Sequence, residues 1–328
     1  MSRILERLDE LYAIGSSRIG DTREEDAAHE LVASWLEEAG LAVEVDAAGN
    51  TIGRRGDGRV WTGSHLDTVP NGGRFDGTLG VVAGIEAAAR IEVPVSVVAF
   101  RDEERGCAGS RALVAAGRVP EAFLELHVEQ GPSLERASAP LGVVTGVCGI
   151  TRGEVVFEGR ADHAGTAPMD ARDDALVKAA EFVLHVARTA SSRPGTFATV
   201  GRVEVEPGGT NVVPSRVTVS VDARAGDATA LDELVAAIGF VPSYRSGPVA
   251  MSDPPLAVLR ELLPEAPELV SGAGHDAAVL AAAGVPAGML FVRSLNGGAS
   301  HSPDELSSED DIVLAVDVLA SALERLAR

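Results

Sequence analysis

The first part of the chain alternates between two hydrophobic patterns. Residues 23–39 carry apolar side chains at helical spacing, and Gly40 is placed to end that helix. Short apolar runs then alternate with predicted helices over 76–90 and 108–117; the runs are LAVEVD, NTIGRR, RVWTGSH, VPVSVVAF and FLELHV. This pattern predicts an α/β fold whose central, mostly parallel sheet has helices on both faces. Such a sheet carries its chemistry at the carboxyl ends of its strands.

A second pattern begins near Gly149. The chain there has the order strand, helix, strand, strand, helix, in ITRGEVVFEG, ARDDALVKAAEFVLHVARTA, TFATVGRVEVE, RVTVSVDAR and ATALDELVAAI. After a stretch rich in proline and glycine, the first pattern returns with a helix over 276–283, the strand AGMLFV and a final helix over 307–327. We therefore predict a discontinuous first domain, residues 1–149 and 241–328, interrupted by an inserted α+β domain over 150–240.

Composition and charge narrow the classes of function. The 328 residues are 45% hydrophobic, which suits a folded globular protein. The 28 Lys and Arg against 49 Asp and Glu give a net charge of −21, which repels phosphate backbones and anionic membrane surfaces. Lys178 is the one lysine and lies in an amphipathic helix, so lysine Schiff-base and phosphate-loop chemistry are excluded. We expect neither a nucleic acid nor a membrane as a partner.

Cysteine usage and the first residues indicate the compartment. Cys107 and Cys148 cannot form a disulfide framework, and neither belongs to a CxxC pair. The opening MSRILERLDELYAIG alternates charged and apolar residues and lacks the uncharged stretch of a signal peptide. No apolar run reaches the ~18 residues that would span a membrane. We expect a cytoplasmic protein, in which Cys107 is a small buried hydrophobe.

The first candidate site residues follow the run RVWTGSH. His65 ends that run, and Asp67 lies two residues on, where it can hold the second ring nitrogen of a metal-ligating histidine. Asp76 lies between glycines in GGRFDGTLG, at the predicted start of a helix. Glycines permit the close backbone approach of a metal loop, but an aspartate at a helix start more often serves as an N-cap. The local pattern leaves both roles open.

The buried run VSVVAF ends in Arg101 followed by three acids, Asp102, Glu103 and Glu104. Adjacent carboxylates raise each other's pKa, so such a cluster is either solvated or bound to a cation. Neighbouring side chains on extended backbone point in opposite directions, so one glutamate could ligate a metal while the other acts as a base. A solvated loop is the simpler alternative.

Two further histidines follow a strand or a glycine-rich loop, His127 in FLELHVEQGP and His301 in GGASHSPDE. His29 and His185 lie on amphipathic helices, where we interpret them as packed residues. Three histidines with an aspartate and a glutamate form a donor set without thiolate, which suits two Zn²⁺ ions, or Mn²⁺ or Co²⁺, that share a carboxylate. Two such ions favour metal-assisted hydrolysis. No GxSxG motif points to a serine hydrolase.

Eight motifs resemble, in order, those of the di-zinc M20 metallopeptidase clan. They are GSHLDTVPNGGRFDGTLGV, FRDEE, GSRAL, LELHVEQGP, ADHAGTAPM, GGTNVVPSRV with DAR, SGAGHDA and GGASHSPDE. Within the clan they are most similar to the branch of N-carbamoyl-L-amino acid hydrolases, allantoate amidohydrolases and β-ureidopropionases. The resemblance runs from about Val45 to Leu306.

The resemblance implies a role for each matching residue. Two divalent ions would be held by His65, Asp76, Glu104, His127 and His301. Asp76 would bridge the ions, while His65 and Glu104 would belong to different ones. Glu103 would be the general base that takes a proton from water and passes it to the leaving nitrogen, and Asp67 would orient His65.

The inserted domain resembles the family's lid and dimerisation domain, which implies a homodimer. His163 would stabilise the oxyanion, reaching the active site of the neighbouring subunit, while Asn211 and Arg224 would hold the substrate carboxylate. Gln130 and His275 match positions that line the same pocket. From the residues alone, Arg224 could be a surface ion-pair residue, Asn211 a turn residue and His275 the neighbour of a helix N-cap.

The chain departs from the family in its loops. The segments after Glu104, between GSRAL and FLELHVEQGP, and before SGAGHDA are all shorter than is usual, which changes the pocket walls rather than the metal residues. VPNGGRFDG is more similar to the carbamoyl-amino-acid hydrolases, whereas Arg293 in LFVRS is similar to the allantoate enzymes. We predict an N-carbamoyl-L-amino acid amidohydrolase, with an allantoate amidohydrolase and an M20 dipeptidase or aminoacylase as alternatives. A metal-binding protein without catalysis would need a missing base or ligand, and none is missing.

Overall fold

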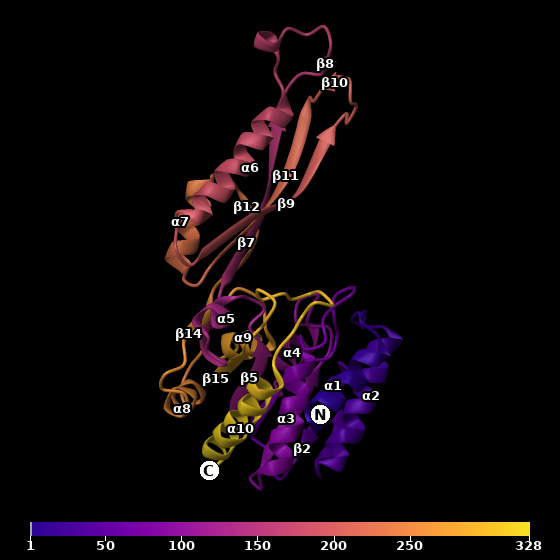
Figure 1. Cartoon of the computed structure of the whole chain (residues 1–328), viewed down its shortest axis with the longest axis vertical. Coiled ribbons are helices and arrows are strands. Elements are labelled where there is room, and N and C mark those ends of the chain that lie inside the picture. Colours follow the sequence, from indigo (N-terminus) through magenta and orange to yellow (C-terminus); the bar gives the residue numbers. More distant parts are fainter. Residues whose placement is uncertain (1) are drawn as a thin grey trace. The chain divides into compact units, whose positions relative to one another are not determined.

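The computed structural model describes residues 2–328 and divides the chain into two units, drawn in Figure 1. One unit runs to Val147 and resumes at Ala250, and the other is Cys148–Val249. The sequence analysis ended the inserted domain at 240. The second unit extends further because Pro242–Ser246 forms an edge strand that pairs with the strand beginning at Gly149.

The first unit contains a nine-stranded sheet among the described residues. Its strands are β1 (Ala42–Val45), β2 (Thr51–Arg54), β3 (Val60–His65), β4 (Val95–Phe100), β5 (Ala122–Val128), β6 (Leu141–Val147), β13 (Val249–Ala250), β14 (Glu268–Ser271) and β15 (Ala287–Val292). The order is β1-β2-β4-β3-β5-β15-β6-β13, and β14 pairs with β6. The central strands β4, β3, β5 and β15 run parallel, whereas antiparallel pairs lie toward the edges. This confirms the predicted, mostly parallel sheet.

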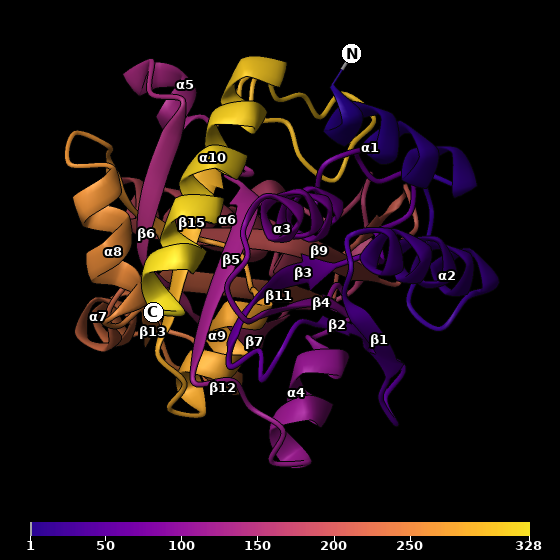
Figure 2. The ribbon, with the colours of Figure 1, turned by 90° about the horizontal axis from the view of Figure 1, so that it is seen from below.

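Helices cover both faces of this sheet, as Figure 2 shows. One face carries α1 (Arg3–Ile14), α2 (Arg23–Glu38), α3 (Thr78–Arg90), α8 (Pro255–Leu262) and α10 (Glu309–Leu326). The other carries α4 (Ala108–Ala115) and α9 (Asp276–Ala282), while α5 (Ser133–Ala137) is a short turn of helix before β6. Because both faces are covered, β3, β4, β5 and β15 are buried at every position, which explains their continuous apolar runs.

The second unit contains a four-stranded antiparallel sheet in the order β12-β7-β11-β9, all within described residues. Its strands are β7 (Gly149–Glu158), β9 (Thr196–Glu206), β11 (Arg216–Ala225) and β12 (Pro242–Ser246). A separate ribbon pairs β8 (Asp162–His163) with β10 (Val212–Val213), and a 3₁₀ turn covers Met169–Ala171. The helices α6 (Ala175–Ser191) and α7 (Ala228–Ile238) pack on one face of the sheet, so burial alternates strictly along β11.

Two predictions from the sequence concern membrane-spanning helices and the two cysteines. Within residues 2–328, no helix has the length and apolar character needed to cross a membrane. Both Cys107 and Cys148 lie in the described part of the chain and are buried and unpaired.

Candidate metal centre

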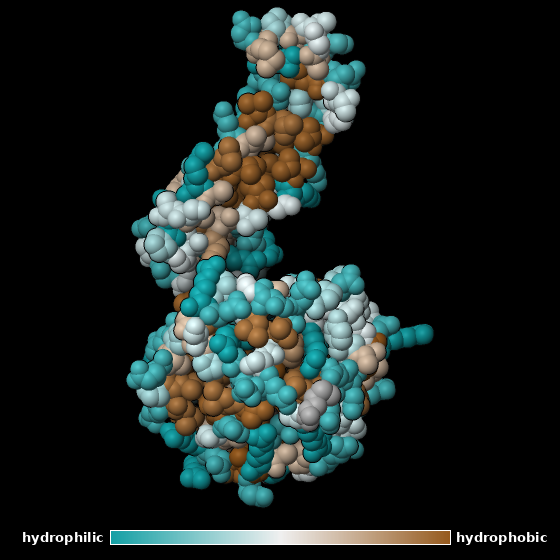
Figure 3. Space-filling view, in the orientation of Figure 1, coloured by the Kyte–Doolittle hydropathy of each residue, from teal (hydrophilic) through white to brown (hydrophobic). Residues whose placement is uncertain are grey.

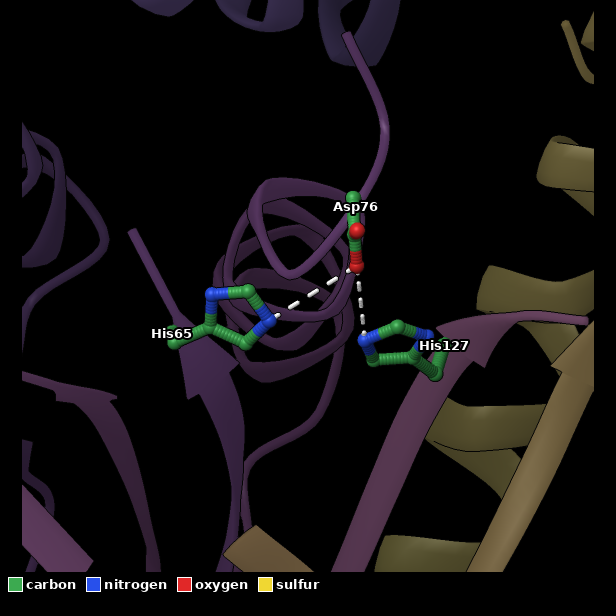
Figure 4. Close-up of side chains that lie close together, drawn as sticks. All are labelled: His65, Asp76 and His127. Atoms are coloured by element: carbon green, nitrogen blue, oxygen red, sulfur yellow. Dashed lines mark ion pairs between the residues drawn. The ribbon is translucent and has the colours of Figure 1, made fainter. Parts of the chain in front are cut away.

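His65, His127 and Asp76 converge at the ends of neighbouring strands, as Figure 4 shows. His65 is the last residue of β3, and His127 lies near the end of β5, its parallel neighbour. Asp76 immediately precedes Gly77, the N-cap of α3. Its Oδ1 lies 3.7 Å from Nε2 of His65 and 3.3 Å from Nε2 of His127. The cap alternative for Asp76 is therefore wrong, because its carboxylate faces the two imidazoles.

The backbone fixes which nitrogen of each imidazole faces Asp76. Nδ1 of His65 donates to the carbonyl of Asp67 at 3.0 Å, and Nδ1 of His127 donates to the carbonyl of Val128 at 2.9 Å. In the neutral form of each ring, Nε2 then carries no proton. Both Nε2 atoms face Oδ1 of Asp76. This is the arrangement in which a protein presents histidine to a metal.

A second group shares Asp76. Oδ2 of Asp76 lies 3.3 Å from Nε2 of His301, which in turn lies 3.6 Å from Oε2 of Glu104. The ligand atoms of Asp76, Glu104 and His301 lie within 4.8 Å of one another, as do those of His65, Asp76 and His127. The structure thus brings together all five residues predicted as metal ligands, with the aspartate common to both groups.

Gly77 makes this convergence possible. It has a φ of +65°, which disfavours other residues, and a Cβ at this position would overlap the ring of His65. Gly77, which follows Asp76 in the motif, therefore serves a close approach.

The residues present fit divalent metal ions. Imidazole nitrogen and carboxylate oxygen without thiolate are the donors that Zn²⁺, Mn²⁺ and Co²⁺ accept. Among the described side chains, Oε1 of Glu104 is buried without a hydrogen-bond partner, a costly state that a cation in this group would relieve. A third cluster, Glu125 with His127 and His275, fits less well, because both oxygens of Glu125 already accept bonds from Ser64 and the backbone of Ala277.

Asp67 holds the acidic loop against the metal groups. Its Oδ1 and Oδ2 each accept a backbone N–H at 3.0 Å, from Glu103 and Glu104 respectively, and Oδ1 lies 3.4 Å from Nδ1 of His65. Asp67 is completely buried, so these contacts compensate for a carboxylate removed from water. One side chain therefore orients a candidate ligand and both glutamates.

Glu103 lies beside the metal groups rather than in one of them. Its Oε2 is 3.9 Å from Nε2 of His65, and its Oε1 accepts a weak bond from Sγ of Cys107 at 3.3 Å. Burial raises the pKa of Glu103 to about 7, with Glu104 adding to the effect and His65 opposing it. A carboxylate with a pKa near neutrality is suited to accept and return a proton.

His127 and Asp76 shift each other's pKa. Burial opposes the charged form of His127, but the Asp76 carboxylate outweighs it and raises the pKa of His127 to about 9. Burial likewise disfavours the Asp76 carboxylate, yet hydrogen bonds from His127 and His301 hold its pKa well below the usual range. The centre therefore brings imidazoles and a carboxylate of opposite charge close together, away from solvent.

Gln130 and His275 lie next to the metal groups, in the same unit. Nε2 of Gln130 donates to Oδ2 of Asp76 at 2.9 Å and lies 3.4 Å from Nε2 of His301. The ring of His275 packs edge-on against His127, with centroids 4.6 Å apart, and its Nε2 contacts Oγ of Ser271 at 2.7 Å. His275 is also the N-cap residue of α9.

The remaining predicted residues, His163, Asn211 and Arg224, belong to the second unit. His163 is exposed in β8, where its Nδ1 accepts the backbone N–H of Gly165 at 3.0 Å, and β8 pairs with the strand that follows Asn211. Arg224 lies on β11, where Nε donates to Oδ1 of Asp222 at 2.8 Å. Within this unit, His163 and Asn211 are neighbours.

Two buried glutamates escaped the sequence analysis. Oε1 of Glu25, on α2, accepts the backbone N–H of Asp102 at 2.9 Å, and Asp102 has a left-handed φ of +50° just before Glu103. Glu305 accepts backbone N–H groups from Phe75 and Asp76. In the sequence, each of them is simply an acidic residue in a helix or a loop. No local pattern distinguishes a buried glutamate at such a position from an exposed one.

Arg293, whose motif resembles that of the allantoate enzymes, is engaged elsewhere. Its Nε and Nη2 donate to both oxygens of Asp311 in α10, at 2.9 and 3.1 Å. This two-pronged bond joins the end of β15 to the last helix, so the guanidinium has a structural contact.

The fold and the gathered donors define a metal-dependent hydrolase, and comparison with known proteins gives the family. The chain matches the peptidase family M20/M25/M40 over residues 61–325 and belongs to it. It is 35% identical to an N-carbamoyl-L-amino acid amidohydrolase of Geobacillus stearothermophilus, over 99% of this chain and 98% of the relative. It is 31% identical to an allantoate deiminase of Arabidopsis thaliana, over 90% of this chain and 75% of that relative.

A solved structure agrees with this assignment. An amidase of the hydantoinase/carbamoylase family from Burkholderia multivorans matches with a TM-score of 0.90 at 32% identity, covering 99% of this chain and 98% of that one. The chain is thus an amidohydrolase of the hydantoinase/carbamoylase branch. The alignment with the Geobacillus relative spans 404 positions against 328 residues here, so that relative has residues without a counterpart, in line with the shorter loops.

Proposed function

We propose that this protein hydrolyses the carbamoyl C–N bond of an N-carbamoyl-L-amino acid, using two divalent metal ions, of which Zn²⁺ suits the donors best. The observation that carries the proposal is the position of Asp76, whose two oxygens face separate groups of ligands while Glu103 lies alongside. His65 and His127 would hold one ion, Glu104 and His301 the other, with Asp76 between them.

The bound ions would supply an acidified water and polarise the carbamoyl carbonyl. Glu103 then takes a proton from the attacking water on its carboxylate and gives it to the nitrogen that leaves. Asp67 keeps Glu103 and Glu104 in place through their backbone N–H groups, so the base stays within reach of the reacting atoms. The products are the free amino acid and a carbamate, which breaks down to ammonia and carbon dioxide.

Four residues are proposed to bind the substrate. Arg224 and Asn211 would hold the substrate carboxylate, and Asp222 fixes the Arg224 guanidinium by accepting from its Nε and Nη2 at 2.8 and 3.3 Å. Gln130 and His275, beside the metal groups, would contact the carbamoyl end. We favour an N-carbamoyl amino acid over allantoate, because VPNGGRFDG is more similar to the carbamoyl-amino-acid hydrolases.

We further propose a homodimer formed through the second unit. Figure 3 shows apolar residues gathered on the second unit, where Figure 1 draws α6. The exposed large apolar side chains of the described residues include Leu176, Val177 and Leu184 on α6 and Val203 on β9. β9 is also an edge strand with unpaired backbone groups. A two-fold pairing of this face with a second copy would cover both the apolar patch and the edge.

In such a dimer His163 of one subunit would act as oxyanion donor for the other. The Glu103→Gln and His163→Ala homodimers should each be nearly inactive. After subunit exchange, half of the dimers are mixed, and each mixed dimer has one site with both changes and one with neither. Activity should recover to about a quarter of wild type by two-fold counting. If mass spectrometry demonstrates exchange and activity does not recover, His163 does not act across subunits.

The experiment that tests the substrate is a screen for ammonia release. The protein, supplied with Zn²⁺, Mn²⁺ or Co²⁺, is given N-carbamoyl-L-amino acids, allantoate and N-acetyl amino acids, and amino-acid release is followed alongside. We expect turnover of the carbamoyl compounds. Preference for allantoate would support the alternative substrate, and release from N-acetyl amino acids alone would support an aminoacylase.

A further inference from the structure

A buried carboxylate, Glu305, connects two of the segments that carry metal-binding residues. Its Oε2 accepts the backbone N–H of Phe75 at 2.6 Å and that of Asp76 at 3.1 Å. Its Oε1 accepts the hydroxyl of Ser300 at 3.2 Å, next to His301. Glu305 is only 5% exposed, so these bonds form away from solvent.

The segment that carries His301 is an irregular loop. Residues 293–308 contain neither helix nor strand, and Asn296, Gly297, Gly298 and His301 itself all have left-handed φ values. The side chain of His301 is 49% exposed, whereas those of His65 and His127 are 2% and 1% exposed. Burial therefore fixes two of the three histidines, and the third depends on contacts made by its loop.

The chain also leaves space for the Glu305 carboxylate. A Cβ at Gly73 would overlap Oε2 and the side-chain carbons of Glu305. The glycine lies in the segment GGRFDG that precedes Asp76, so it allows the carboxylate to reach the two N–H groups. Charge-assisted bonds from backbone N–H to carboxylate are among the stronger hydrogen bonds in proteins.

We infer that Glu305 is a positioning residue that sets the distance between the bridging carboxylate of Asp76 and the imidazole of His301, and so controls the affinity for the ion of the Asp76, Glu104 and His301 group. This rests on the proposed two-metal centre. A ligand set binds tightly only if its members are held within about 0.5 Å of the required geometry by supporting contacts. Glu305 supplies such contacts to two ligands at once, one through the backbone of Asp76 and one through Ser300.

The test compares Co²⁺ binding to the metal-free full-length chain and its variants, followed by visible absorption and calorimetry. Glu305→Gln keeps the size of the side chain but replaces an accepting oxygen by a donating amide. We expect two bound ions in wild type, and in Glu305→Gln one binding step weakened about 10- to 100-fold, the usual cost of losing a supporting contact to a ligand. The absorption of the weakened step should change as well, since the ligand geometry changes.

Asp304→Asn is the matched control, because it removes one negative charge from the adjacent exposed residue. We expect it to keep both binding steps at wild-type affinity. A merely structural role for Glu305 would lower the melting temperature of the metal-free protein and leave both metal affinities unchanged, which would overturn the inference. If Glu305→Gln does not fold, Ser300→Ala decides, since it removes only the hydroxyl link; unchanged Co²⁺ affinities in that variant would also overturn it.

Failure of the proposed function has a different signature. Wild type that binds no Co²⁺ would contradict the metal centre itself. Wild type that binds two ions, together with a Glu305→Gln variant that binds both equally well, would contradict only the role of Glu305.

Discussion

The two units hold their candidate site residues in opposite ways. In the first unit, His65, His127 and Asp76 are almost completely buried, and the backbone or a buried carboxylate fixes each of them. In the second unit, His163 and Asn211 are exposed, and Arg224 is half-buried on a sheet face that no helix of that unit covers. We propose a corresponding division of roles, in which the buried residues of the first unit carry the chemistry and the exposed residues of the second unit recognise the substrate.

The first unit also shows two kinds of buried histidine. His65 and His127 face carboxylates, and the pKa of each is raised. His29 in α2 is equally buried, contacts Thr51 through Nδ1 at 2.9 Å, and has a pKa lowered to about 3 by burial and then by Arg101. The histidines differ in the net charge around them: Asp76 lies within 3.7 Å of His65 and His127, whereas Arg101 opposes a charge on His29 even though Oε1 of Glu25 is 4.0 Å from its Nε2.

The largest effect should follow from changing the base in the first unit. Glu103→Gln keeps the side-chain size and the backbone bonds to Asp67 but cannot accept a proton. We expect kcat to fall about 10²- to 10⁴-fold, the usual contribution of a general base, with metal content and KM unchanged. Glu104→Gln is the comparison, because it should lose metal. If Glu103→Gln loses metal and Glu104→Gln keeps it, the two roles are exchanged.

A smaller effect is expected from the second unit. Arg224→Lys keeps the charge and removes the two-pronged geometry, so KM for a carboxylate substrate should rise roughly tenfold or more, since a hydrogen bond to a charged group contributes about 1.5–3 kcal/mol. Arg216→Lys is the control, because Arg216 lies on the same face of β11 and pairs with Glu158 at the surface. Equal KM values for the two variants would show that Arg224 does not hold the carboxylate.

The smallest effect concerns His29 and the stability of the metal-free chain. As pH falls below 6.5, the unfolded state binds a proton at this residue that the folded state does not accept until about pH 3. This contribution destabilises the fold by about 2 kcal/mol at pH 5. His29→Gln should lose less stability than wild type between pH 7 and pH 5 in urea unfolding. Parallel pH profiles would contradict the neutral, buried state of His29.

The sequence predicted the central sheet and the polar residues at its strand ends for one physical reason. Strands covered on both faces are apolar throughout, so the polar residues where β3, β4 and β5 end stand out. The helix-start pattern could not decide whether Asp76 was a cap or a ligand, because both roles place an acid there. The contacts of Glu305 with Phe75 and Asp76 join segments 230 residues apart, and a local pattern carries no information on them.

Strands without a distinctive pattern were also missed. β6 was not singled out, although most of its residues are buried and it pairs with β15, and β12 lies in the stretch that was described only as rich in proline and glycine. Gly142, Thr145 and Gly146 interrupt the apolar run of β6, which is why its burial did not make it recognisable, whereas the exposed edge strand β1 was predicted from LAVEVD.

The most direct test of the account is a measurement of metal content against activity. Wild type is stripped with a chelator, reconstituted with increasing Zn²⁺, and analysed by elemental mass spectrometry while hydrolysis of an N-carbamoyl-L-amino acid is followed. We expect no turnover in the stripped protein and full turnover at two ions per chain, with His127→Ala binding fewer. Full activity of the stripped protein would contradict the central claim that the Asp76 groups of the first unit hold the catalytic metals.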